Sequence, residues 1–317
     1  GSSVHRRFTI APFAGDPFSI APDHEFLLDD EVDAESFGDI GIRPASQRGA
    51  DPKGLDRTGY AAAVSKAIKH IDTGASTKVV LSRTLEADLN GIDVVQLFDA
   101  ACRSLPNAMV VLANTDAHGL WLGASPERLL HCDSSSIEVD SIAGTMRTSI
   151  VPPNVDAWGD KEREEQDLVT RSIIDTLAIA GCEDVRVDGP QVLRAGSVAH
   201  LRTTIRARSE GVDVARLAAD LHPTPAVGGT PKANALEVIA ALEPSDRKLY
   251  AGYWGVMDGR SADLYVNIRC MEVVGGTAVL HVGAGVTAAS DPERECDEVE
   301  LKARTWLDLI EAQRRGG

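Results

Sequence analysis

The 317-residue sequence contains few aromatic side chains and no long hydrophobic run. Phe, Trp and Tyr make up only 4% of the chain although 43% of its residues are hydrophobic. A core would therefore consist mainly of Ala, Val, Leu and Ile, and the chain is long enough to bury a sizeable one. No apolar stretch reaches the roughly 18 residues that a membrane-spanning helix requires, so no membrane-spanning helix is expected.

Basic residues are also in deficit. The chain has 48 Asp and Glu against 32 Lys and Arg, giving a formal net charge of -16. Nucleic acids and anionic membrane surfaces bind clustered Lys and Arg, so neither is expected as a partner. No hydrophobic signal segment follows Gly1-Ser2-Ser3. The five cysteines are scattered without a CxxC spacing, which is typical of reduced thiols in a cytoplasmic protein.

A glycine-rich phosphate loop is missing as well. Gly283-Ala-Gly285 lacks the third glycine and the following helix of a dinucleotide-binding turn, so nucleotide binding is not expected. Residues 1–56 are expected to form a short irregular N-terminal segment, with a loop over residues 43–54, and residues 57–317 a single domain. Asp258-Gly259 and Gly275-Gly276 each predict a hairpin turn between two strands.

Hydrophobic periodicity indicates an α+β domain with large antiparallel sheets. Helices are predicted at 55–72, 93–105, 160–181, 213–220, 232–242 and 291–314. Strands are predicted at 78–83, 108–113, 119–123, 128–131, 136–140, 185–187, 198–207, 252–257, 263–273 and 277–287.

Two pairs of glutamates stand at the beginnings of predicted helices. Glu162 and Glu165 open the helix at 160–181, and Glu295 and Glu298 follow Pro292, which suits a first helical position. Residues three apart share a helix face, so meeting helices would gather four carboxylates around one point. Carboxylates without clustered His or Cys suit a hard cation such as Mg²⁺. Alternatively, these glutamates are solvated and favour the helix dipole.

Eight motifs occur in a defined order along the chain. They are Lys78-Val-Val-Leu-Ser-Arg83, Gly123-Ala-Ser-Pro-Glu127, Ala143-Gly-Thr-Met-Arg147, Leu221-His-Pro-Thr-Pro-Ala-Val-Gly-Gly-Thr-Pro231, Tyr250-Ala-Gly252, Asn267-Ile-Arg269, Gly283-Ala-Gly285 and Ser290-x-Pro-x-x-Glu-x-x-Glu-x-x-x-Lys302. Together they resemble the chorismate-utilising enzymes, which include isochorismate, salicylate, anthranilate and aminodeoxychorismate synthases. The resemblance covers about residues 57 to 314 and is specific because the motifs fall in register.

The resemblance implies a fold of the anthranilate synthase component I type, with two stacked antiparallel sheets and helices outside, and a requirement for Mg²⁺. It implies that Lys78 is a general base activating water and that Glu127 is a general acid. The metal ligands it implies are Glu162, Glu165, Glu295 and Glu298. The residues it places near the substrate are Gly144, Thr145, His200, Ala226, Tyr250, Arg269, Gly283, Gly285 and Lys302.

Local chemistry is compatible with the two catalytic roles. Lys78 begins an apolar strand, where burial would favour the neutral amine, and Glu127 precedes Leu129 and Leu130, which would help it keep a proton. The alternatives are a lysine at a strand end facing water and a glutamate in a surface turn.

The substrate-binding residues have similar arguments. Arg269 is expected in an alternating strand, where an inward guanidinium needs an anionic partner, and a guanidinium matches a carboxylate bidentately. Tyr250 could donate a hydroxyl to the same group. Gly283 and Gly285 would let backbone N–H groups approach a ligand, or else mark a strand bulge. His200 is by default a satisfied histidine within a sheet, and the resemblance places it near the ring hydroxyl.

The sequence departs from the family pattern in places. Glu162 stands where Asp or Glu is usual, and Glu164 and Gln166 replace common histidines beside Glu165. Ser141 stands where a proline often precedes the Ala-Gly-Thr motif. The expected metal ligands are kept, while the fine position of their helix is open.

Within the family, these residues favour an isochorismate synthase. Relatives that use ammonia resemble one another in a Gln at the position of Lys78, so water is the expected nucleophile and no glutamine amidotransferase subunit is expected. Aminodeoxychorismate synthases resemble one another in a Lys where this chain has Ala143. Salicylate synthases more often carry a Thr at the position of Ala226, and they remain the alternative. A cation-binding scaffold without chemistry is the non-enzymatic alternative.

Overall fold

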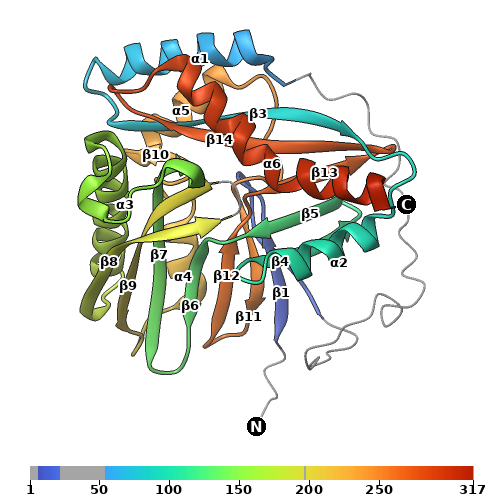
Figure 1. Ribbon diagram of the computed structural model, residues 1–317. Helices are drawn as coiled ribbons and strands as arrows, with labels where there is room; N and C mark the ends of the chain where they lie inside the picture. Colours follow the sequence, from blue (N-terminus) through green and yellow to red (C-terminus); the bar gives the residue numbers. More distant parts are fainter. Residues whose placement is uncertain (1–5, 22–53, 196–197, 317) are drawn as a thin grey trace.

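The computed structural model describes residues 6–21, 54–195 and 198–316, and it contains two antiparallel sheets with helices outside them (Figure 1). The predicted α+β fold class is confirmed. The predicted loop at 43–54 lies outside the described residues except for its last residue. Across the described ranges, every helix is too short or too polar to cross a lipid bilayer.

The larger sheet has eight strands. Their order across the sheet is β2 (Phe18–Ile20), β1 (Arg7–Ala11), β11 (Tyr253–Met257), β12 (Ala262–Val266), β6 (Arg128–Cys132), β7 (Ser136–Arg147), β9 (Val198–Arg208) and β8 (Glu183–Ala195). The β11–β12 hairpin turns at Asp258-Gly259, as predicted. Residues 6–21 were expected to be irregular, but β1 pairs with β11 over five residues and extends this sheet. The boundary between residues 56 and 57 remains a prediction.

The smaller sheet has six strands. Their order is β10 (Gly229–Thr230), β3 (Lys78–Asp88), β14 (Thr277–Val286), β13 (Cys270–Val274), β5 (Gly119–Ser125) and β4 (Met109–Thr115). β3 and β14 pair continuously from Val79 opposite Val286 to Asp88 opposite Thr277, without a bulge. Gly283 and Gly285 therefore sit in a regular strand.

The predicted strand at 263–273 is divided in two, which corrects the sequence prediction. Its first half is β12 in the eight-stranded sheet and its second half is β13 in the six-stranded sheet. The chain changes sheet at residues 267–269, where Arg269 has φ +49°. Arg269 is therefore at a corner between the two sheets and not inside an alternating strand.

Helices cover the outer faces, and most begin at a side-chain cap. They are α1 (Arg57–Ile71), α2 (Val94–Ser104), α3 (Asp160–Ile179), α4 (Val214–Leu221), α5 (Lys232–Leu242) and α6 (Pro292–Gly316). Asp56, Asp93 and Asp213 accept hydrogen bonds from the first-turn backbone N–H groups of α1, α2 and α4. Asp291 does the same for Glu293 and Arg294 at the start of α6.

Two hydrophobic cores separate the layers. One contains inward side chains of the eight-stranded sheet together with Trp121 of β5 and the apolar faces of α3 and α4. The other fills the space between the six-stranded sheet and α1, α2, α5 and α6. The sheets are therefore stacked, and the corner at Arg269 lies where they meet.

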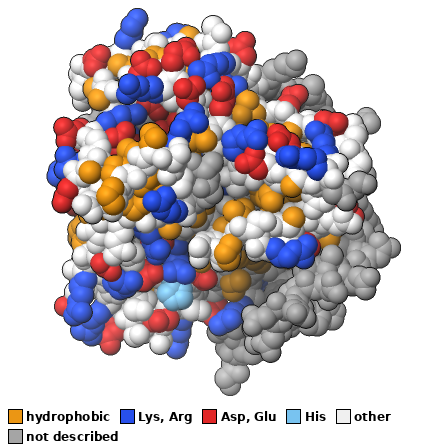
Figure 2. Space-filling view, in the orientation of Figure 1, with side chains coloured by type: hydrophobic (Ala, Val, Ile, Leu, Met, Phe, Trp, Pro, Cys, Tyr) orange, Lys and Arg blue, Asp and Glu red, His pale blue; other side chains and the backbone are white. Residues whose placement is uncertain are grey.

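Ion pairs hold helices α1 and α6 together. Arg57 of α1 forms ion pairs with Glu293, Asp297 and Glu300 of α6 at 2.8–2.9 Å. Figure 2 shows acidic and basic side chains interspersed across the top of the molecule, where α1 lies. These pairs fix the N-terminal half of α6, which carries two of the predicted metal ligands.

Candidate active site

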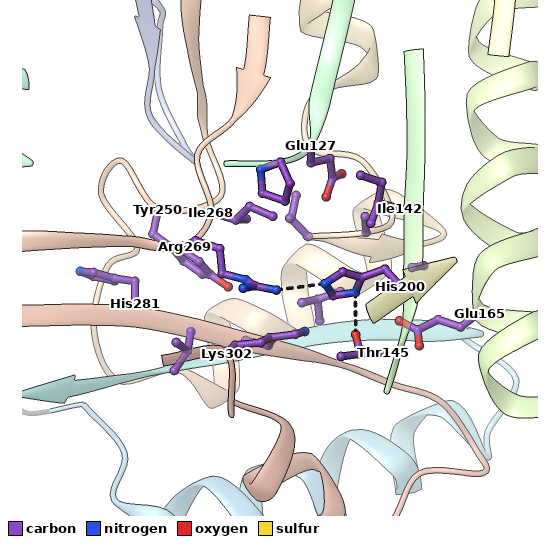
Figure 3. Close-up of a pocket in the computed structure, with 18 residues that line it drawn as sticks. Glu127, Ile142, Thr145, Glu165, His200, Tyr250, Ile268, Arg269, His281 and Lys302 are labelled. Atoms are coloured by element: carbon purple, nitrogen blue, oxygen red, sulfur yellow. Dashed lines mark hydrogen bonds between the residues drawn. The ribbon is translucent and has the colours of Figure 1, made fainter. Parts of the chain in front are cut away.

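A cavity lies at the corner between the two sheets and collects residues from distant parts of the chain (Figure 3). The predicted site residues that line it are Glu127, Thr145, Glu165, His200, Ala226, Tyr250, Arg269, Gly283, Gly285 and Lys302. Lys78, Gly144, Glu162, Glu295 and Glu298 do not line this cavity. The sequence therefore identified most of its polar wall.

Three side chains form a hydrogen-bonded chain across the cavity. An Arg269 guanidinium nitrogen is 2.9 Å from Nε2 of His200, and Nδ1 of His200 is 3.1 Å from Oγ1 of Thr145. Since a guanidinium only donates, Nε2 accepts and Nδ1 carries the proton. Burial and the Arg269 cation lower the pKa of His200 well below its usual value, so the imidazole is neutral.

Arg269 is a buried cation whose hydrogen-bond partners are uncharged. Its guanidinium donates to His200 and, at 2.8 Å, to the hydroxyl of Thr305. Burial lowers its pKa to about 10, while Glu298, Tyr250 and Glu127 oppose that shift. A desolvated guanidinium beside a cavity is a strong site for a carboxylate, because the charge then gains a bidentate partner.

Glu127 lies between β5 and β6 with its carboxyl turned into the same cavity. Its side chain is buried, and its Oε1 has no hydrogen-bond partner within the described structure. Burial, helped by the charge of Asp140, raises its pKa to about 8 against the opposing charges of Lys78, Lys302 and Arg269. Glu127 is therefore protonated near pH 7 and can donate a proton to a bound ligand. The alternative of a surface glutamate is wrong.

Lys78 begins β3 and is fully buried immediately behind the cavity wall. Its Nζ lies 2.9 Å from Oε1 of Glu165, which does line the cavity. A Cβ added to Gly285 would come within 2.3 Å of that Glu165 oxygen and 2.8 Å of Cε of Lys78. The glycine is thus required by the close approach of these side chains, and a lysine directed at solvent is excluded.

Lys302 of α6 occupies the opposite wall from Glu127 (Figure 3). Its Nζ donates to the carbonyl of Gly283 at 2.8 Å and forms an ion pair with Glu298 at the same distance. A Cβ at Gly283 would lie 2.6 Å from the hydroxyl of Tyr250, so this glycine makes room for the tyrosine. The ammonium, the hydroxyl and the guanidinium of Arg269 all favour an anionic ligand.

The remaining predicted carboxylates line an adjoining cavity. Glu162, Glu295 and Glu298 surround it, and Thr145 belongs to both cavities. Glu295 accepts from Lys161 of α3 at 2.5 Å, so an ion pair joins α3 to α6. Lysines thus neutralise Glu165, Glu295 and Glu298, one each. Within the described ranges, no three acidic, His or Cys side chains converge closely enough to form a ready metal site.

The donor set nevertheless fits a hard divalent cation. Oε2 of Glu295 is buried without a hydrogen-bond partner, and burial together with Glu298 raises the pKa of Glu295 to about 7. A cation at this position would satisfy that oxygen and stabilise both carboxylates. Oxygen donors from carboxylates are what Mg²⁺ prefers. The carboxylates of α3 and α6 are therefore suitable ligands once their lysine partners are displaced.

Two residues that depart from the family pattern contact each other. The side-chain amide of Gln166 donates to the carbonyl of Ser141 at 2.9 Å and lies 3.1 Å from its hydroxyl. It also reaches the hydroxyl of Thr203 at 3.1 Å. Both Gln166 and Ser141 are buried, so this network ties α3 to β7 and β9. The helix carrying Glu162 and Glu165 is held in place by these substituted residues.

Sequence reasoning missed the apolar wall and the support behind it. Val80, Ile142, Val227, Ile268 and Val282 also line the cavity, together with His281. His281 stacks on Tyr250 with ring centroids 5.6 Å apart. In the sequence, the valines and isoleucines are indistinguishable from core residues. His281 lies two residues before Gly283, a spacing that places it on the same face of β14.

A buried arginine supports three parts of this wall. Arg247 donates to the carbonyls of Val80 and Val227 at 2.7 and 2.8 Å. It also pairs with Glu243 at 2.5 Å, and Glu243 accepts from the backbone and hydroxyl of Ser82. The guanidinium of Arg247 therefore connects the loop containing Ala226 to β3 through these two carbonyls.

Comparisons with known proteins identify the family of this chain. The family described as chorismate binding enzyme matches residues 42–308. The isochorismate synthase MenF of Escherichia coli is 30% identical over 265 residues, 81% of this chain and 61% of MenF. The isochorismate synthase EntC of Escherichia coli is 32% identical over 269 residues, 80% of this chain and 68% of EntC.

A solved structure gives the same picture. The menaquinone-specific isochorismate synthase MenF from Escherichia coli superposes with a TM-score of 0.76 and 25% identity, covering 96% of this chain and 79% of that one. The chain spans about three fifths of the full length of the MenF sequence it matches. On the extent of the family match and the identity to these relatives, the chain belongs to the chorismate binding enzyme family.

Proposed function

We propose that this protein is an isochorismate synthase that uses Mg²⁺ and converts chorismate reversibly to isochorismate. The observation that carries the proposal is that one cavity brings together Glu127, a buried protonated carboxyl, and Arg269, with the Lys78–Glu165 ion pair at its wall. An acid, a base and an anion-binding cation are the groups this reaction needs. The names of the similar proteins MenF and EntC support the same activity.

The chain's residues divide the work of the reaction. In its neutral form, Lys78 takes a proton from a water that attacks C2 of the ring, and the ring double bond shifts. Glu127 gives its proton to the C4 hydroxyl, which leaves as water. One water enters and one leaves, so the reaction is close to balanced and reversible. Arg269 and Lys302 hold carboxylate groups of the substrate and keep the ring oriented between acid and base.

A bound Mg²⁺ supplies charge neutralisation and orientation of the ring carboxylate. Glu165 and Glu298 are its proposed ligands, with Glu162 and Glu295 supporting them. His200 and Thr145 are uncharged donors and acceptors beside the ring, and they can bind a hydroxyl without competing for the cation. Thr145 lines both cavities.

Water is proposed as the nucleophile because a buried lysine is suited to deprotonate it, whereas ammonia needs no strong base. We therefore propose no glutamine amidotransferase subunit. A cytoplasmic location is also proposed. Whether the product supplies menaquinone or a siderophore is a question of the pathway that consumes isochorismate.

The test is product identification after incubation with chorismate and Mg²⁺. Isochorismate is the expected product, detected by chromatography and by a coupled enzyme that consumes it. An aminated product formed with ammonium salts would overturn the assignment of water. Unchanged chorismate under all these conditions would favour a cation-binding scaffold.

Salicylate synthase is the alternative within the family. It needs the same acid, base and metal, so these residues do not distinguish the two. Ala226 lines the cavity and offers no hydroxyl to the bound ring, and Pro225 stiffens the loop that carries it. We propose that isochorismate is released before pyruvate is eliminated. Salicylate fluorescence rising as fast as isochorismate, without a partner enzyme, would favour the alternative.

A further inference from the structure

Two neighbouring residues of α6 contact Arg269 at opposite ends. The hydroxyl of Thr305 accepts from the guanidinium at 2.8 Å, and the indole Nε1–H of Trp306 donates to the backbone carbonyl of Arg269 at 2.6 Å. The backbone N–H of Ala124 donates to the same carbonyl at 3.0 Å. The guanidinium and the backbone carbonyl of Arg269 are therefore both held by residues from other segments of the chain.

The backbone of Arg269 needs such support. Its φ of +49° lies in the left-handed region, which is unfavourable for a residue with a Cβ. The chain changes sheets at this corner, so neither β12 nor β13 continues its ladder through residue 269. The carbonyl of Arg269 accepts two hydrogen bonds, and these hold the backbone conformation that directs the side chain into the cavity.

The guanidinium also needs an anchor on the side away from the ligand. One terminal nitrogen faces His200 in the cavity, and the other faces Thr305. A second cavity lies behind it, lined by Thr305, Arg194, Asn107 and Pro126. Without the hydroxyl of Thr305, the guanidinium has room to turn toward this space and leave His200.

We propose that Thr305 and Trp306 are positioning residues that set the pose of Arg269 for recognition of a substrate carboxylate. The proposal rests on the function proposed above, because it assigns the anion held by Arg269 to chorismate. Neither residue touches the reacting atoms. Thr305 orients the guanidinium, and Trp306 fixes the backbone from which it extends.

The kinetic test uses a matched pair of variants. Thr305→Val keeps the shape and removes the hydroxyl, whereas Thr305→Ser keeps the hydroxyl. Because Arg269 holds a carboxylate away from C2 and C4, Thr305→Val should raise KM for chorismate roughly tenfold with little change in kcat. Thr305→Ser should retain the wild-type KM. An unchanged KM in Thr305→Val, or equal loss in both variants, would overturn the proposal.

A structural test is independent of turnover. Crystal structures of wild type, Thr305→Val and Trp306→Phe are compared at residue 269. We expect the guanidinium to leave His200 in the first variant and the Arg269 carbonyl to rotate in the second. An unaltered Arg269 in Thr305→Val would contradict the proposal even if Trp306→Phe failed to fold. If wild type did not convert chorismate, the proposed function would fail while this comparison still decided the positioning role.

Discussion

Nζ of Lys78 lies 2.9 Å from Oε1 of Glu165, and water reaches 0% of the lysine side chain and 12% of the glutamate side chain. The proposed base is therefore in direct contact with a proposed metal ligand. Burial alone would raise the pKa of Glu165, but the ammonium of Lys78 outweighs it and the pKa is lowered. The charge of Glu165 inside the protein therefore depends on Lys78.

Lys78→Ala should abolish conversion of chorismate and also destabilise the fold. Removing the ammonium leaves Glu165 as an uncompensated buried charge, which costs about 3–5 kcal/mol in comparable cases. Loss of a general base typically lowers the rate by about 10²–10⁴. Steady-state assays and thermal unfolding measure the two effects. Lys66→Ala on the exposed side of α1 is the control, and turnover by a folded Lys78→Ala protein would contradict the assignment.

Because of Glu127, the kcat of the wild type should fall at alkaline pH. Its pKa of about 8 means that the acid form is lost above that pH, so kcat should fall there. Glu127→Gln should be nearly inactive and lack this limb. A pH–rate profile of both proteins checks the prediction. A wild-type rate that keeps rising well above pH 8 would argue against Glu127 as the acid.

Glu127 should also make the stability of the protein depend on pH. A carboxyl whose pKa is raised by folding binds more protons folded than unfolded, so stability is lost as pH rises from about 4 to 8. Glu127→Gln removes that loss. Its Tm relative to wild type should therefore increase from about pH 5 to about pH 8, measured by calorimetry.

Metal removal should stop the reaction. EDTA should abolish activity, and added Mg²⁺ should restore it. Glu298→Gln should bind Mg²⁺ more weakly, because one neutral ligand weakens a hard-cation site. It also leaves Lys302 without its ion pair. Isothermal titration with Mg²⁺ measures the loss separately from activity. Full activity of Glu298→Gln in chelated buffer would remove the metal from the proposal.

Lys161 should compete with the cation. Its ammonium occupies Glu295, so Lys161→Met should tighten Mg²⁺ binding by roughly tenfold, since one competing positive charge is removed. The exposed variant Lys66→Met should bind like wild type. Equal or weaker Mg²⁺ binding by a folded Lys161→Met protein would show that Lys161 supports the site instead of competing for it.

Much of the fold followed from local patterns. The six predicted helices and the two hairpin turns agree with the structure because caps, apolar periodicity and Gly pairs act over a few residues. The division of residues 263–273 into two strands was not predicted, because the sequence of β12 and β13 shows one continuous alternation of apolar residues. The sheet to which each half belongs is decided by strand neighbours far along the chain.

The site was predicted to a similar degree. Its polar residues have motifs, whereas Arg247, Thr305 and Trp306 act through contacts across 20 or more sequence positions. The pairing of three lysines with three glutamates was also missed. The pairs Lys78–Glu165 and Lys161–Glu295 join residues more than 80 positions apart, which no local pattern encodes, whereas Lys302 and Glu298 stand four apart on one helix face.

Helix α6 carries supports for both ends of the proposed substrate. Glu298, a proposed ligand of the cation, and Thr305, which orients Arg269, stand seven residues apart on nearly the same face. At 1.5 Å per residue, this spacing is about 10 Å. Because a helix is stiff over two turns, the distance between these two residues is fixed. Under the proposed function, α6 therefore fixes how far the ligand of the cation lies from the residue that orients Arg269.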